Sequence, residues 1–184
     1  YRNRAWQKAD LMDILMDEQG MNALRFRVWV NPSGGWSGKQ DVIGLCRRAH
    51  AKGYDIMIDF HYSDTWADPA NQTTPAAWAD YDMEKLKTAV TDHTVSVLTL
   101  LKENGVEVEW VQVGNETRGG MLWPLGKYEN GKNSLLIGYF LIRFHLLILN
   151  YQPHYTIPSS TFPQLHICKK LYCIIRYKAM SRLM

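Results

Sequence analysis

Glu116 is the residue of this sequence best placed to do acid–base chemistry. It ends the apolar-rich run 107–116 and stands next to Asn115, and Gly114 leaves room for close approach. A carboxyl at a half-buried position is suited to general acid catalysis because burial disfavours its charged form. The Asn115 amide could hold a sugar hydroxyl. On spacing alone, a solvated and inert carboxylate at a strand end is the simpler interpretation of Glu116.

A second group of oxygen and nitrogen donors follows another apolar run and contains Asp59, His61, Asp64 and Asp68. Such a group could in principle bind a metal ion. The sequence has no H-x-H, H-E-x-x-H or C-x-x-C spacing, so we expect no metal and no cofactor, and predict hydrogen bonds within a polar pocket. A metal-dependent hydrolase that uses His61 and Asp64 remains an alternative.

Two arginines alternate with a tryptophan on the run 22–30, so Arg25, Arg27 and Trp29 should share one face of a strand. Buried arginines need carboxylate partners. A structural ion pair explains them as well as a substrate contact does. Flat aromatic faces also suit the apolar face of a sugar ring, although most tryptophans pack in cores. The sequence is rich in them, with Trp29, Trp36, Trp66, Trp78 and Trp123.

Strands and helices are predicted to alternate along the chain. Composition, periodicity and helix-end signals predict helices over 10–19, 41–52 and 83–104, and strands over 22–30, 55–62 and 107–116. Asp41 is a plausible N-cap of the second helix, and Gly20, Gly53 and Gly105 follow the three helix ends.

This alternation requires parallel strands with helical crossovers. An open doubly wound sheet and a (β/α)8 barrel both fit. The loop 31–40 lacks the glycine fingerprint of a nucleotide-binding sheet. All three strands end in polar or aromatic residues, as barrel enzymes require at the rim that carries the active site. We therefore predict an α/β fold, a partial (β/α)8 barrel. Three strands cannot close a barrel of eight.

The composition changes near residue 132. Residues 1–132 hold all 18 acidic residues and 15 of the 21 Lys and Arg, whereas residues 133–184 hold six basic residues and no acid. We expect 1–132 to be the N-terminal part of a barrel domain and 133–184 to be an atypical tail, produced by a frameshift or read-through. A divergent barrel half is the alternative for this tail.

Charge and hydropathy favour neither nucleic acid nor membrane as a partner. The net charge of +3 gives no case for nucleic-acid binding. The apolar run 134–149 is shorter than the roughly 20 residues that a transmembrane helix needs, and it contains Arg143 and His145.

Three motifs resemble glycoside hydrolase family 53, the endo-β-1,4-galactanases of galactan and type I arabinogalactan. The motifs are LRFRVWVNP (24–32), DFHYSDTWADP (59–69) and VGNETRGGMLWPLG (113–126). The resemblance spans about residues 10–126 and implies a (β/α)8 barrel that uses two glutamates in retaining chemistry. It implies that Glu116 is the acid/base. The implied substrate-binding residues are Arg25, His61, Trp66 and Asn115.

The resemblance also makes the three predicted strands the second, third and fourth of the barrel. The family's nucleophile is a glutamate after strand seven, and this chain has no acidic residue after Glu129. We therefore expect that the beginning of the barrel is missing, that two sheet edges are open, and that the chain as given is unstable and inactive on galactan. The substrate class implies a secreted or cell-envelope location. A non-catalytic carbohydrate-binding remnant is the alternative function.

Overall fold

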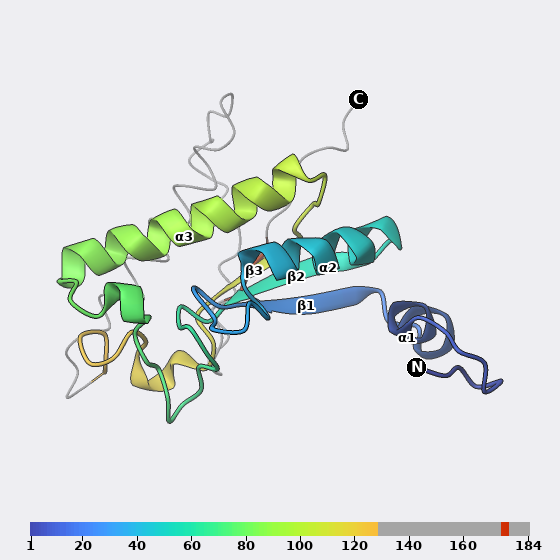
Figure 1. Ribbon diagram of the computed structural model, residues 1–184, viewed down its shortest axis with the longest axis horizontal. Helices are drawn as coiled ribbons and strands as arrows, with labels where there is room; N and C mark the ends of the chain where they lie inside the picture. The colour runs from blue at the N-terminus through green and yellow to red at the C-terminus, as the bar shows by residue number, and fades with distance from the viewer. Residues whose placement is uncertain (129–173, 177–184) are drawn as a thin grey trace, which may run out of the picture.

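A computed structural model describes residues 1–128 and the backbone of residues 174–176 (Figure 1). The predicted boundary near residue 132 and the apolar run 134–149 lie outside the described residues. Within the described part, no helix is long and apolar enough to cross a membrane. In chain order the elements are α1 (Leu11–Gln19), β1 (Ala23–Val28), α2 (Lys39–Ala51), β2 (Asp55–Phe60), the 3-10 helix η1 (Ala76–Trp78), α3 (Met83–Glu103), β3 (Trp110–Val113), the 3-10 helix η2 (Thr117–Gly119) and β4 (Ile174–Arg176).

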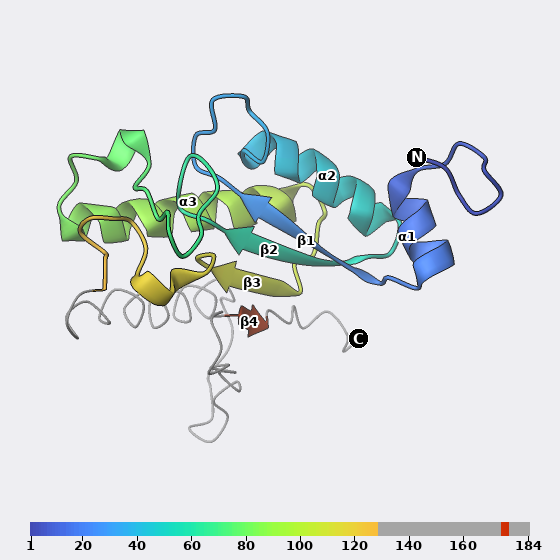
Figure 2. The same cartoon turned by 90° about the horizontal axis from the view of Figure 1, so that it is seen from below.

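Strands β1, β2 and β3 form a parallel sheet in chain order, joined by α2 and α3. The two helices lie on the same face of the sheet, as both Figure 1 and Figure 2 show. Figure 2 also shows the loops that follow the three strands gathered at the carboxyl ends of the strands, opposite α1. The predicted order of elements is confirmed, and with it two consecutive βα units followed by a third parallel strand.

The helix ends follow the predicted signals, with one exception. Asp10 caps α1 by accepting a hydrogen bond from the Met12 amide, and Gly20 ends the helix at φ 67°. The prediction of Asp41 as the N-cap of α2 is wrong, because the helix begins two residues earlier and its N-cap is Gly38. Asp41 lies in the first turn, where its Oδ2 accepts from the Ser37 amide at 2.8 Å.

All three strands are shorter than predicted, and the residues that follow β1 pair with two loops. After β1, the Trp29 amide donates to the Ser37 carbonyl at 2.8 Å, and the Val30 amide to the Ser63 carbonyl at 2.9 Å. The chain therefore stays hydrogen-bonded beyond the last strand residue. These loop contacts bind the rim segments to one another.

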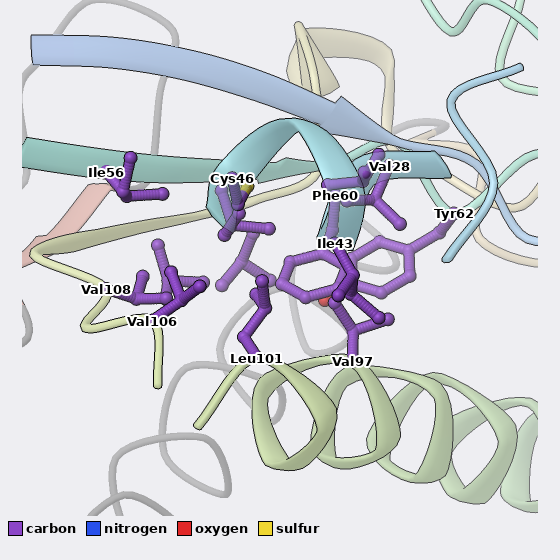
Figure 3. Packing of buried hydrophobic residues seen from close by; sticks show 14 of the residues in the cluster. Val28, Ile43, Cys46, Ile56, Phe60, Tyr62, Val97, Leu101, Val106 and Val108 are labelled. Carbon is purple, nitrogen blue, oxygen red and sulfur yellow. The ribbon is translucent and has the colours of Figure 1, made fainter. Parts of the chain in front are cut away.

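A continuous apolar core lies between the sheet and the helices α2 and α3 (Figure 3). It is built by the alternate strand residues that face the helices, and burying each large apolar side chain contributes roughly 1.5–3 kcal/mol. The residues labelled in Figure 3 are Val28, Ile43, Cys46, Ile56, Phe60, Tyr62, Val97, Leu101, Val106 and Val108, all less than 10% exposed.

The other face of the sheet carries a different set of residues. In the β1–β2–β3 register, Arg27, Asp59 and Gln112 form one row, and Arg25 with Met57 lies in the adjacent row. This face would line the inside of a barrel. Polar side chains there do not serve the apolar core, so they are available to build a site at the carboxyl ends.

The expectation of two open sheet edges is wrong for one of them. The short strand β4 pairs antiparallel with β3, from Trp110↔Arg176 to Gln112↔Ile174. The next strand of a (β/α)8 barrel would pair parallel to β3. Strand β4 therefore covers this edge without continuing the barrel pattern.

Candidate active site

Glu116 lies where β3 has just ended, half-buried, in a backbone conformation that is unusual for its type. Its φ and ψ are 49° and 45°, in the left-handed region, and it precedes η2. Gly114 also has a positive φ, 79°, and a Cβ on it would collide with the Thr117 side chain and lie 3.2 Å from Met121 Sδ. Only glycine both adopts this positive φ readily and lacks the Cβ for which position 114 has no room. The turn thus presents Asn115 and Glu116 at the rim.

Arg25 connects β1 to the neighbouring strand β2 and to the turn after β3 through one nitrogen. Its Nη2 donates to Asp59 Oδ2 at 2.5 Å and to Asn115 Oδ1 at 2.8 Å. The Arg25 side chain is 46% exposed and that of Asp59 only 1%. The expected carboxylate partner is therefore present, and it is Asp59. The expectation that Arg25 is buried is wrong within the described residues, since its head lies at the open face.

Asn115 is held from two sides, which fixes the orientation of its amide. Its Oδ1 accepts from Arg25 and from Gln112 Nε2, the latter at 3.3 Å, and its Nδ2 donates to the Ala67 carbonyl at 2.7 Å. The residue is 4% exposed. An amide nitrogen carries two protons, and within residues 1–128 the second Nδ2 proton has no partner.

Both ring nitrogens of His61 are used inside the protein. Nδ1 accepts from the Ala67 amide at 3.1 Å, so Nε2 carries the proton and donates to Asp59 Oδ2 at 3.1 Å. His61 is 2% exposed. Neither nitrogen has a free lone pair for a metal ion. The predicted hydrogen-bonded pocket thus accounts for His61.

Asp64 and Asp68 shape the loop 63–78. Asp64 accepts from the Asn31 amide at 2.9 Å through Oδ1 and from the Ala76 amide at 2.8 Å through Oδ2. Asp68 Oδ1 accepts from the Ala70 amide at 2.8 Å. Among residues 1–128, no group of three His, Cys, Asp or Glu side chains is arranged to hold a metal ion. The metal-dependent alternative has no support in this geometry.

The Trp66 ring packs against the ring of His61. Their ring centroids are 5.2 Å apart and inclined by 66°. The Arg27 guanidinium lies 5.0 Å from the Trp66 ring and 5.1 Å from that of Trp29, within the range of cation–π attraction. Trp66 is 47% exposed, so part of its ring remains open to a ligand.

The five tryptophans singled out from the sequence have different fates. Trp29 and Trp66 lie at the rim beside Arg27, and Trp78 is in the core at 8% exposure. Trp36 is 75% exposed. Trp123 joins the segment after β3 to the loop 63–78, since its carbonyl accepts from Thr74 Oγ1 at 2.7 Å.

Sequence reasoning missed Gln72 entirely. This side chain is 2% exposed, and its Nε2 donates to the Asn115 carbonyl at 2.7 Å. It stands within a long polar loop with no period to distinguish it. The structure thus brings together Arg25, His61, Asn115 and Glu116 at one rim, with Trp66 against His61, and adds Asp59 and Gln72 beneath them.

A comparison of the sequence with known protein families shows which family this chain resembles. The model described as glycosyl hydrolase family 53 matches residues 1–139, three quarters of the chain. The chain belongs to glycosyl hydrolase family 53.

Two relatives of similar sequence come from Aspergillus fumigatus and Humicola insolens. The chain is 43% identical over 133 residues to a probable arabinogalactan endo-beta-1,4-galactanase A of Aspergillus fumigatus, and 43% identical over 136 residues to the arabinogalactan endo-beta-1,4-galactanase of Humicola insolens. These matches cover 72% of this chain but only 37% and 40% of the two relatives. The chain spans about two fifths of the length of the relatives it matches.

Solved structures from family 53 share the fold. One, from a study of two fungal beta-1,4-galactanases, is 45% identical, has a TM-score of 0.67 and covers 71% of this chain and 39% of its own. A second, the GH53 catalytic domain of Ignisphaera aggregans, is 34% identical, has a TM-score of 0.74 and covers 83% and 44%. The prediction of a partial (β/α)8 barrel is confirmed.

Proposed function

We propose that this family 53 chain carries the acid/base half of a retaining endo-β-1,4-galactanase, with galactan or type I arabinogalactan as its polysaccharide partner. The names of its relatives support the substrate class. The observation that carries the mechanism is the Asn115–Glu116 pair, which lies just after β3 and is held by contacts from β1 and the loop 63–78. The same substrate class favours a secreted or cell-envelope location.

In this proposal Glu116 protonates the leaving glycosidic oxygen and then, as a base, activates the water that releases the sugar. Retaining chemistry also needs a nucleophilic carboxylate about 5–5.5 Å away. Asp59, Asp64 and Asp68, the acidic residues of the 59–69 motif, accept hydrogen bonds from protein groups. No acid follows Glu129 in the sequence. We therefore propose that the 184-residue chain alone does not turn over galactan.

Other rim residues take supporting roles in the proposal. Asn115 offers its remaining amide proton to a sugar hydroxyl, and Trp66 offers its exposed ring to the apolar face of a sugar. Arg25 and His61 share Asp59 Oδ2. They therefore contribute mainly by fixing one another and Asn115 at the edge of the sugar site.

The acid/base role is tested in the galactanase chimera, in which residues 1–128 of this chain replace the matching segment of the Humicola insolens enzyme. Glu116→Gln should reduce turnover of galactan by roughly 10²–10⁴, the value of a positioned general acid. An aryl β-galactoside with a good leaving group needs little protonation, so its first step should lose less. Glu107→Gln, an exposed glutamate, is the matched control.

Three results would contradict the acid/base assignment. They are a folded but inactive unsubstituted chimera, equal losses on both substrates with Glu116→Gln, and inversion of the product anomer by NMR. For the chain itself, reducing-end release from galactan and thermal unfolding are measured on residues 1–184. Measurable hydrolysis together with a cooperative transition would refute the proposed inactivity.

A non-catalytic carbohydrate-binding role is the second candidate, favoured by the exposed Trp66 beside Arg27. It predicts that the 184-residue chain is retained on galactan and releases no reducing ends. Loss of retention in Trp66→Ala would support this role, whereas no retention of the unsubstituted chain would exclude it.

A further inference from the structure

We propose that Gln72 is a positioning residue, which holds the backbone of Glu116 in the conformation that aims its carboxyl into the site. The inference rests on the proposed acid/base role of Glu116 and names a support that lies on a different loop. It concerns orientation, since Gln72 touches the main chain of residues 115 and 116 and acts through them.

The contacts of Gln72 converge on the turn that carries Glu116. Nε2 lies 2.7 Å from the Asn115 carbonyl, 3.4 Å from that of Glu116 and 3.0 Å from that of Asp68. All three partners are acceptors, so the nitrogen of the amide must face them. Oε1 is buried and has no hydrogen-bond partner within the described residues. The hydrogen bonds that Nε2 donates therefore determine the orientation of the Gln72 side chain.

The backbone of Glu116 needs such a support. Its φ of 49° places a side chain with a Cβ in the left-handed region, which non-glycine residues seldom adopt. Strained conformations of this kind persist only where the surroundings fix them. Gln72 binds the two carbonyls on either side of the Glu116 Cα, which are the groups that rotate when φ and ψ of Glu116 relax.

Gln72 is itself fixed from both sides along its own backbone. Its carbonyl accepts from the Trp123 amide at 2.8 Å, and the preceding residues form a reciprocal pair in which Asp68 and Asn71 exchange amide–carbonyl bonds at 2.9 and 3.1 Å. Because the backbone of Gln72 is fixed in this way, its amide restricts the movement of the carbonyl groups that it binds. Gln72 therefore links the loop after β2 to the catalytic turn after β3.

The experiment uses the galactanase chimera with Gln72→Glu, which keeps the shape but replaces the donor by an acceptor, and with Gln72→Met, which removes the amide without adding charge. Gln40→Glu on the exposed surface of α2 is the matched control. We expect each Gln72 variant to lose roughly 10- to 100-fold in kcat on galactan, as for a small misplacement of a catalytic group, and less on the aryl β-galactoside. KM should change little.

The double variant separates positioning from general stability. If Gln72 acts through Glu116, then Gln72→Met should cost far less activity in a Glu116→Gln background than alone. Additive losses, equal losses on both substrates, or failure of both Gln72 variants to fold would overturn the proposal and make Gln72 a purely structural residue. If Glu116→Gln itself lacks the leaving-group dependence, the acid/base proposal fails first, and the two failures are thereby distinguished.

Discussion

Replacing His93 by Phe should make a family 53 barrel that carries this segment markedly more resistant to acid unfolding. His93 lies on α3 with its ring packed edge-on against Phe60, Tyr62 and Trp78, at centroid distances of 5.9, 6.4 and 6.2 Å. Its Nε2 is buried and has no hydrogen-bond partner within residues 1–128. Protonation would place a positive charge among apolar rings with nothing to accept its hydrogen.

The size of the effect follows from the pKa. Burial, with a smaller contribution from the charge of Lys39, lowers the pKa of His93 from its ordinary 6.5 to about 4. Between these values the unfolded chain binds a proton that the folded chain does not, so stability falls as the pH falls from 6.5 to 4. At pH 4 this difference in pKa corresponds to about 3 kcal/mol.

The assay is urea denaturation of the galactanase chimera and of its His93→Phe variant between pH 7 and pH 4. The difference in unfolding free energy between the two should shift by about 3 kcal/mol in favour of Phe across this range. His50→Phe on α2 controls for the loss of a histidine as such. A difference that stays constant with pH would refute the argument, because it would mean that His93 gains its proton equally easily in both states.

Three further predictions concern the rim and its supports in the same chimera. Gly114→Ala should lose about 2–4 kcal/mol in urea denaturation, from the positive φ and the collision with its neighbours, whereas Gly44→Ala in the exposed middle of α2 should not destabilise; equal effects would contradict the geometry. Arg25→Lys should lower kcat/KM on galactan roughly 10- to 100-fold, because a lysine must replace two charge-assisted hydrogen bonds with a differently shaped head, and near wild-type activity would leave Arg25 a structural role. Trp66→Ala should raise KM for galactan several-fold and Trp36→Ala should not; the same KM for both variants would remove Trp66 from the sugar site.

The convergence of the site could be predicted from the sequence because parallel strands bring their carboxyl ends to one edge. Arg25, His61 and Asn115 lie far apart along the chain, yet Arg25 lies on β1, His61 directly follows β2 and Asn115 lies just after β3. The parallel topology therefore brings them towards the same rim. The sequence also predicts that the partner of Arg25 is a carboxylate. Its identity as Asp59 required the register, in which Asp59 lies one row above Arg25 on the neighbouring strand.

The environments of Gln72 and His93 were not predicted from the sequence, for two different reasons. Gln72 lies in an irregular loop, where no period relates neighbours, and its role exists only because Trp123 and the turn after β3 meet that loop in space. His93 did leave a signal, since it falls within the spacing of Val90 and Val97 on the apolar stripe of α3. A histidine on such a stripe predicts a buried ring, and hence a lowered pKa.

The support of Glu116 has a consequence for how the protein is made. The contacts described for the turn at Gly114–Glu116 come from residues between Arg25 and Trp123. Ribosomes deliver polypeptides from the N-terminus, at about 5–20 residues per second. The loop after β2, in which Asp68 and Asn71 exchange backbone hydrogen bonds, therefore leaves the ribosome before β3 does. The residues described as holding the turn of Glu116 are therefore all synthesised within seconds of Glu116 itself.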